Sequence, residues 1–345
     1  MQFGVRLPHS GPLASAEAIA QVTCHAERLG FEAVLTHDHV NWGMSDKYHF
    51  YCGSLELAVS HPRPTDFYDA FSSMAYLAGM TSRIRFVSAA IVLAWRHPLM
   101  LARLALTLHH LSGRRFALGI CVGNVPRDFE VLGVNWEQRA EIAEEHLDVV
   151  HRALREDGPL SYEGKFVRFQ GAELFPKAPE LPIWYGGTSP RGLKRAARYT
   201  EGLIVGGPAV ELRRLRDKVM RLRQEVGRGG APFTMATLAM ISIDRDAARA
   251  EAIAAKTLEE RERAAWLRKQ RRQYTERDAA LVGTPAALRQ RLQALADAGV
   301  DFVGLGFVGP SLQSVLDRMA LFAEEVMPAF ADPAARAAGA LGGAS

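Results

Sequence analysis

A His-Asp-His triplet followed by a tryptophan is the part of the chain whose residue types suggest chemistry most directly. His37, Asp38 and His39 end a short apolar run, and Trp42 follows three positions later. Two histidines at this spacing can bind a metal, but a catalytic metal usually has a third protein ligand, and no HxxxH pair or further carboxylate stands nearby. The remaining interpretations are a polar strand end in which Asp38 caps a turn, and a site of proton transfer.

For the proton-transfer interpretation, we expect His39 to face a ligand and to donate or accept a proton. A histidine ring suits this role because its unperturbed pKa of about 6.5 lies close to neutrality. The adjacent carboxylate of Asp38 would orient the ring, and Trp42 would supply a flat apolar wall. We expect His37 to be structural.

A second candidate site lies in the segment IWYGGTSPRGLKRAAR, where two glycines and two hydroxyl residues precede an expected helix. Gly186 and Gly187 let the backbone approach an anion, and Thr188 and Ser189 can donate hydrogen bonds. Free N–H groups at a helix start favour phosphate. The sequence therefore predicts a phosphate pocket, and the alternative is a glycine-rich turn with a serine cap.

Two further expected strands carry small side chains of interest. Ala89 and Ala90 would let a planar ring lie against the backbone, although alanine is equally ordinary in the core of a barrel. Cys121 ends another strand, where a free cysteine is more often a small core residue than a nucleophile.

The segments that must position these residues alternate between short apolar runs and longer amphipathic stretches. Strands are expected at 3–7, 32–36, 84–93, 115–122, 182–186, 201–206, 234–243 and 301–307. Helices are expected at 15–29, 67–80, 98–111, 136–154, 189–198, 209–227, 246–278, 285–298 and 310–327. This pattern predicts an α/β fold, a (β/α)8 TIM barrel. A doubly wound open sheet is the rival, but no GxGxxG turn follows the first strand.

The predicted barrel carries insertions after its second and fourth strands. We expect residues 41–66 and the hairpin-like segment 160–182 to act as lids or pocket walls, because connections at the carboxyl ends of barrel strands build the sites of such enzymes. Residues 1–331 would form one domain. The tail 332–345 is rich in small residues, and we expect it to be disordered.

Composition narrows the class of protein. The formal net charge of +4 comes from Lys and Arg scattered among nearly as many acids, which argues against nucleic acid as a partner. Three cysteines without a CxxC pair, at Cys24, Cys52 and Cys121, argue against a disulfide framework and favour a reducing compartment. No apolar run reaches membrane-spanning length, and the amino terminus lacks a leader pattern. We therefore expect a cytoplasmic protein that does not bind membranes.

Several blocks of the chain, taken in order, resemble one known family. They include ERLGFEAVLTHDH, RIRFVSAAIVLAWRHPLMLARLALTLHHLSGRRFALGICVGN, RDFEVLGVNWEQRAE, YEGKFVRF, IWYGGTSPRGLKRAAR and VGTPAALRQRLQALADAGVDFVGLGF. Over residues 1–330 the chain resembles the bacterial luciferase-like family of flavin- and deazaflavin-dependent oxidoreductases. The resemblance implies a TIM barrel that binds the ring of its cofactor across the carboxyl-terminal mouth.

The resemblance also implies particular contacts. A non-prolyl cis peptide is expected at Ala89-Ala90, or one bond earlier, against the cofactor ring. A homodimer is expected to pack through helices near the second and third strands, such as 67–80 and 98–111. The residues implied in cofactor binding are Ser88, Ala89, Ala90, Cys121, Asn124, Tyr162, Gly186, Gly187, Thr188 and Ser189.

Two branches of the family compete for the cofactor. The blocks SAAIVL and GICVGN with RDFEVLG look like the luciferase α chain, which uses reduced FMN and dioxygen, although Val122 replaces its phosphate-binding arginine. Asp38 and His39 with Trp42 look like deazaflavin-dependent members. We expect a reduced-flavin monooxygenase that acts on a small organic substrate and is supplied by a separate reductase. The alternatives are a deazaflavin (factor 420)-dependent dehydrogenase or reductase, and a non-catalytic flavin-binding subunit.

Overall fold

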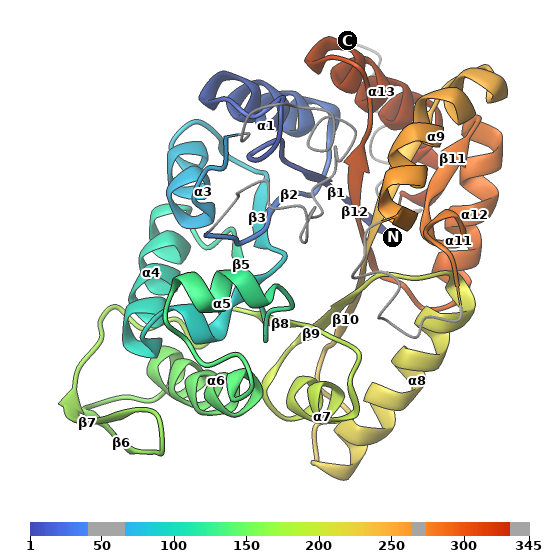
Figure 1. Cartoon of the computed structure of the whole chain (residues 1–345). Coiled ribbons are helices and arrows are strands. Elements are labelled where there is room, and N and C mark those ends of the chain that lie inside the picture. The colour runs from blue at the N-terminus through green and yellow to red at the C-terminus, as the bar shows by residue number, and fades with distance from the viewer. Residues whose placement is uncertain (41–65, 264–273, 332–345) are drawn as a thin grey trace, which may run out of the picture.

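Eight parallel strands close into a barrel that helices surround (Figure 1). The computed structural model describes residues 1–40, 66–263 and 274–331. Neighbouring strands pair in the order β12-β1-β2-β3-β5-β8-β9-β10, and β10 pairs with both β9 and β12, which closes the ring. The barrel strands are β1 (Gln2–Arg6), β2 (Ala33–Thr36), β3 (Arg85–Ser88), β5 (Phe116–Cys121), β8 (Ile183–Gly186), β9 (Gly202–Val205), β10 (Thr234–Ile243) and β12 (Phe302–Phe307). The predicted (β/α)8 barrel is confirmed.

Most of the surrounding helices begin and end within three residues of their predicted bounds. They are α1 (Ala16–Leu29), α3 (Ala70–Ala78), α4 (Pro98–Leu111), α5 (Pro126–Val131), α6 (Arg139–Arg155), α7 (Pro190–Tyr199), α8 (Ala209–Glu225), α9 (Ala247–Arg263), α11 (Glu276–Ala279), α12 (Pro285–Asp297) and α13 (Leu312–Glu325). Local signals explain this agreement, because Ser15, Ser189 and Thr284 cap helix starts with their hydroxyl oxygens. The short helix α5 was not predicted. The predicted helix 246–278 agrees with α9 over 247–263, and its part at 264–273 lies outside the described residues. Tyr274 and Thr275 are not helical, so α11 is a separate short helix, contrary to prediction. No helix in the described ranges is long and apolar enough to cross a membrane.

The insertion after the fourth barrel strand does not act as predicted. It holds α5, α6 and a hairpin of β6 (Leu160–Glu163) and β7 (Arg168–Ala172), which lies at the outer edge of the molecule beside α6 (Figure 1). Glu145 on α6 fixes the hairpin turn by accepting hydrogen bonds from the backbone N–H groups of 165–167. The hairpin is therefore no pocket wall. Nearly all of the insertion after the second strand, 41–66, lies outside the described residues.

The third strand is broken where a continuous run, 84–93, was predicted. After β3, a cis peptide joins Ala89 to Ala90, and β4 (Ile91–Val92) and a 3-10 turn, η1 (Leu93–Trp95), follow. The Ser88 hydroxyl donates to the Gly119 carbonyl at 2.9 Å and accepts from the Gly119 N–H at 2.8 Å, so it joins β3 to β5 at the break. A β-carbon at Gly119 would lie 1.8 Å from the Ser88 carbonyl oxygen, which explains the glycine. The predicted cis bond is confirmed.

Two apolar layers build the core. Inside the barrel, side chains from several strands meet in one cluster, made of Ala33, Leu35, Val87, Ala117, Trp184, Ile204, Ala236 and Phe302. A larger cluster fills the space between the strands and the helices. Gly4 and Gly304 leave room for the Leu35 side chain in the inner layer. This rigid frame fixes the strand ends that carry the polar residues.

A pair of buried histidines joins the ends of β1 and β2. His9 is fully buried, its Nδ1 lies 3.2 Å from the Leu7 carbonyl oxygen, and its Nε2 accepts from the His37 N–H at 3.1 Å. The two rings lie edge to face with centroids 4.2 Å apart, and His37 Nε2 lies 3.2 Å from the Ser10 hydroxyl. Burial lowers the pKa of His9 to about 4 and lowers the pKa of His37 well below its ordinary value. Both rings are therefore neutral near pH 7, and the structural role predicted for His37 agrees with these contacts.

These histidines predict a loss of stability in acid. In the unfolded chain they titrate near pH 6.5, so between pH 6.5 and about 4 the unfolded state binds more protons than the folded state. The free energy of unfolding should fall as the pH drops through this window, by roughly 3 kcal/mol from His9 alone. Urea unfolding at pH 7.5, 5.5 and 4.5 measures this loss.

His9→Gln is the matched control, because an amide side chain can replace both ring contacts without titrating. Its free energy of unfolding should depend less on pH than that of the wild type. Equal pH dependence of the two proteins would contradict the assignment.

Candidate active site

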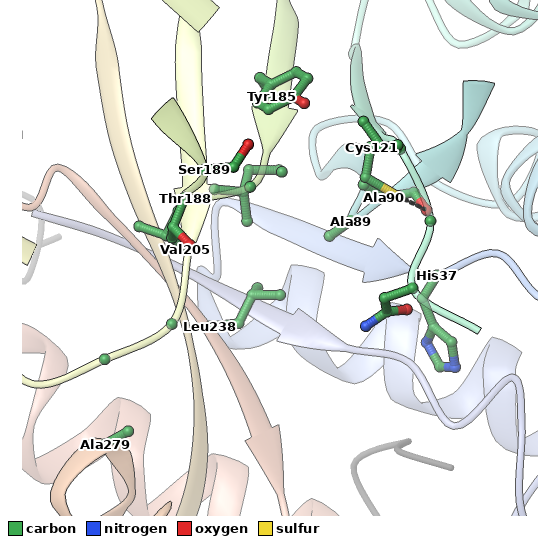
Figure 2. Close-up of a pocket in the computed structure, with 18 of the residues that line it drawn as sticks. His37, Ala89, Ala90, Cys121, Tyr185, Thr188, Ser189, Val205, Leu238 and Ala279 are labelled. Atoms are coloured by element: carbon green, nitrogen blue, oxygen red, sulfur yellow. Dashed lines mark hydrogen bonds between the residues drawn. The ribbon is translucent and has the colours of Figure 1, made fainter. Parts of the chain in front are cut away.

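One pocket opens at the carboxyl ends of the barrel strands and has a volume of about 1010 Å³. Figure 2 shows Ala89, Ala90 and Cys121 on one side of it and Thr188 and Ser189 on the other. Most of the predicted site residues line this pocket, although they come from strands far apart in sequence. They are Asp38, His39, Ala89, Ala90, Cys121, Asn124, Gly186, Gly187, Thr188 and Ser189.

His39 is held by a carboxylate that the sequence did not single out. Its Nδ1 lies 2.9 Å from Oδ2 of Asp128, which is fully buried at the start of α5. A carboxylate only accepts, so the Nδ1–H group of His39 donates this hydrogen bond. The His39 ring also lies 6.2 Å from that of Trp95, centroid to centroid. Asp128 therefore fixes the His39 ring in the pocket wall.

Asp38 does not orient the neighbouring ring, which corrects the prediction from the sequence. Its two carboxylate oxygens accept from the guanidinium of Arg96 at 2.6 and 2.9 Å. Oδ2 also accepts from the Val92 N–H at 3.1 Å. Asp38 is 4% exposed, and it joins the end of β2 to the segment that follows the cis peptide. Its place is structural, although it lines the pocket.

Cys121 lies beside the cis peptide. Its Sγ is 3.8 Å from the Ala90 carbonyl oxygen, and burial raises the pKa of its thiol to about 12. At neutral pH it is an uncharged thiol, which makes it a small apolar surface and a poor nucleophile. The sequence interpretation of Cys121 as a packing residue therefore agrees with its environment.

The glycine-rich segment 186–189 forms the opposite side of the pocket. Ser189 caps α7 by accepting from the Gly192 N–H at 3.0 Å, and Gly187 has a φ of 155°, which only glycine adopts readily. The start of α7 thus presents backbone N–H groups and the Thr188 hydroxyl. Arg195, which follows one turn later, does not line the pocket, because it pairs with Glu144 at 2.7 Å.

Two residues implied in cofactor binding lie elsewhere, and one cannot be placed. Ser88 is fully buried behind the pocket wall, where its hydroxyl is used by Gly119. Tyr162 belongs to the outer hairpin and stacks on Phe169 at 6.3 Å. We correct both to structural positions. Trp42 lies outside the described residues.

The sequence reading missed several pocket residues. Trp95 lies against Phe129 with ring centroids 5.7 Å apart, and it supplies the flat wall that was expected from Trp42. Asp128 and Arg96 belong to the blocks RDFEVLG and AWRHP, so the signal was present in the resemblance but not in local spacing. The turn Gly206-Gly207 before α8 also lines the pocket. No three His, Cys, Asp or Glu side chains of the described residues lie together as a metal site would require.

Comparison with known proteins places this geometry in a family. The uncharacterized protein Rv0940c of Mycobacterium tuberculosis is 29% identical over 235 residues, which are 65% of this chain and 80% of that protein. The crystal structure of monooxygenase RslO1 from Streptomyces bottropensis has a TM-score of 0.76 at 22% identity, and the match covers 96% of this chain and 100% of that one. An F420-dependent secondary alcohol dehydrogenase, in complex with an F420-acetone adduct, has a TM-score of 0.78 at 18% identity, with coverage of 96% and 99%.

At these identities the two solved structures show a shared fold. The family is shown by sequence, since the model described as luciferase-like monooxygenase matches residues 1–302. The chain therefore belongs to the luciferase-like monooxygenase family of oxidoreductases.

Proposed function

We propose that the protein is a reduced-FMN-dependent monooxygenase that oxygenates a small organic substrate. The observation that carries this proposal is that a backbone platform of small residues and a glycine-rich helix start are two sides of one pocket. The first suits a planar ring, and the second suits a phosphate. The pocket of about 1010 Å³ is at the upper end of the usual range for ligand sites, so it leaves room for a cofactor and a substrate together.

The residues present fit such a cofactor. Ala89, Ala90 and the neutral thiol of Cys121 would contact the ring, and Thr188 with the N–H groups that start α7 would hold the phosphate. Reduced FMN, when bound, supplies the electrons with which dioxygen is activated. Leu238 lines the pocket between its two sides and Val205 lines it beside Thr188, and both favour an apolar substrate (Figure 2).

His39 is the group of this chain that would move a proton. Because Asp128 holds Nδ1, the ring keeps one orientation and one tautomer, and proton exchange takes place at Nε2. Burial of Asp128 preserves this pairing from competition by water. Trp95 and Val92 narrow the pocket beside the ring and help to exclude solvent.

The second candidate is a deazaflavin-dependent dehydrogenase or reductase. The His39–Asp128 pair favours it, since such a pair suits removal of the proton from a substrate hydroxyl as a hydride leaves its carbon. Similar folds occur in proteins named for each of the two kinds of reaction.

Cofactor binding tests the proposal directly. Under anaerobic conditions reduced FMN should bind with a micromolar or lower Kd, followed by fluorescence, and reduced riboflavin should bind at least about tenfold more weakly because it lacks the phosphate. Thr188→Val should weaken FMN and leave riboflavin unchanged. Binding of only the deazaflavin coenzyme would select the second candidate, and binding of neither would overturn both.

If the His39–Asp128 pair transfers a proton, substitutions of the two residues should lower kcat by different amounts. His39→Gln should lower kcat by about a hundredfold or more, with the Kd for cofactor changed less than about threefold. Asp128→Asn should retain part of the rate and shift its pH profile, because the ring loses its fixed tautomer. His25→Gln, on the outer helix α1, is the control. A pH profile unchanged in Asp128→Asn would argue against the pairing.

We further propose a homodimer formed through α3 and α4. These neighbouring helices, with the turn that follows α3, expose large apolar side chains, with Tyr76 52%, Met80 46%, Met100 58% and Leu111 69% exposed. Apolar residues gathered on adjacent helices are typical of an interface between protein chains.

Charges placed on this surface should break the dimer. Met100→Glu with Leu111→Glu should shift the mass measured by light scattering from two chains to one. Val210→Glu changes an equally exposed residue on α8 and should leave the mass unchanged. A wild-type protein that is monomeric at micromolar concentration would contradict this proposal.

A further inference from the structure

Positive charge is concentrated on two neighbouring helices beside the pocket. Residues 190–230, which hold α7 and α8, carry 11 of the 42 Lys and Arg residues but only 4 of the 38 Asp and Glu residues. The rest of the chain therefore has a net negative charge, although the whole chain is positive. The two helices lie next to each other in Figure 1.

On α7 the exposed cations share one stripe. Arg195 faces α6, where it contacts Glu144 and the Ala140 carbonyl oxygen. The stripe one step round the helix, Arg191, Lys194 and Arg198, is exposed. Successive residues of a helix are about 100° apart, so of these three side chains Lys194 points farthest from the direction of Arg195. Because Arg195 faces α6, Lys194 is the one nearest to α8.

On α8 the cations divide between two flanks. Arg213 donates to the Asp297 carbonyl oxygen at 2.6 Å, and Arg216 lies against Gly299, so both face α12. Arg214, Lys218 and Arg221 follow the i, i+4, i+7 spacing of a single stripe on the opposite flank. This stripe lies on the outer side of α8, away from the buried side chains of Leu212, Leu215 and Val219.

Several of these cations have no acidic partner. Lys194, Lys218 and Arg221 form no ion pair with any residue that the structure describes, whereas Arg214 pairs with Glu211 at 2.6 Å. Their field is therefore not cancelled locally. Both helices start at the carboxyl ends of the strands, where Ser189 and Arg214 line the pocket. The positive surface thus runs up to the side of the pocket proposed to hold phosphate.

We infer that the basic face, defined as the side chains of Arg191, Lys194, Arg198, Arg214, Lys218 and Arg221, steers the phosphate-bearing cofactor into the pocket. All of these side chains are exposed except that of Lys218, which is partly buried. This inference rests on the proposed function and adds a kinetic role to it. A phosphate monoester carries nearly two negative charges at pH 7, and cationic surfaces raise the association rates of such ions by about 10-fold to 1,000-fold. Capture speed matters here because a reduced flavin free in aerated water loses its electrons to dioxygen.

Steering acts at long range, so it predicts a particular kinetic signature. Fields of exposed charges reach about 30 Å at 0.01 M salt and about 8 Å at 0.15 M. Lys194, Lys218 and Arg221 do not line the pocket. Their removal should slow association of the cofactor without changing its dissociation, and salt should abolish the difference.

The test compares K194Q/K218Q/R221Q with a control of equal charge change, R83Q/R85Q/R168Q. Arg83 and Arg85 lie at the opposite, amino ends of the strands, and Arg168 lies on the outer hairpin. Stopped-flow fluorescence follows binding of FMN and of riboflavin, which lacks the phosphate, at 10 mM and 300 mM salt. The association rate constant for FMN should fall about threefold to tenfold in the first variant at 10 mM salt. Riboflavin, the control variant and the high-salt rates should match the wild type.

Three results would overturn the inference. The first is an unchanged association rate of FMN with K194Q/K218Q/R221Q. The second is an equal fall in the association rate of riboflavin, which would indicate a structural effect. The third is a faster dissociation of FMN, which would indicate direct contact. A wild-type protein that binds neither FMN nor the deazaflavin coenzyme would instead defeat the proposed function. If the wild type takes only the deazaflavin coenzyme, the same rates are measured with that coenzyme.

Discussion

The break in the third strand is the constraint on which the pocket depends. Ser88 holds the chain before the break through Gly119, and Asp38 holds it after the break through Val92 and Arg96. Each clamp uses buried polar groups that would be costly to leave unpaired. Between the clamps, the Ala89-Ala90 backbone lines the pocket instead of continuing the ladder to β5.

The same contacts position His39. Because Asp38 is bound to Val92 and Arg96, the chain after β2 lies beside the segment that follows the cis peptide. From there the His39 side chain contacts α5. On α5, Asp128 takes the ring nitrogen, and its neighbour Phe129 packs edge to face on Trp95. One short helix thus fixes both the polar and the flat part of the pocket wall.

The two sides of the pocket differ in their charged and neutral groups. On the side of Ala89 and Cys121, the Cys121 thiol has a pKa raised by burial and His37 has a pKa lowered by it, while the carboxylate of Asp38 is paired with Arg96. On the side of segment 186–189, the start of α7 presents backbone N–H groups, whereas the nearby Arg195 pairs with Glu144 and Arg214 with Glu211. Positive charge without partners lies farther out, on the basic face, where it affects approach more than the bound state.

Local patterns were sufficient for the barrel and for the glycine-rich start of α7. Strand and helix periods depend on residues close in sequence, and the turn 186–189 combines its glycines, hydroxyls and helix start within a few residues. The predictions from sequence were wrong where the position of a segment depends on a contact with a residue far away in the chain. The alternation in segment 160–182 predicts a hairpin that acts as a lid or pocket wall. Instead, Glu145 on α6 holds the hairpin at the outer edge of the molecule.

The sequence by itself therefore determined the order of elements, the closed parallel barrel, the place of His39 after the second strand and the glycine-rich start of α7. Only the tertiary structure decided which carboxylate serves His39. Asp38 is adjacent in sequence but is turned toward Arg96, whereas Asp128 is 89 residues away and meets the ring at 2.9 Å. The reason is physical, because a hydrogen bond depends on the direction of side chains in space, and that direction is set where separate strand ends meet.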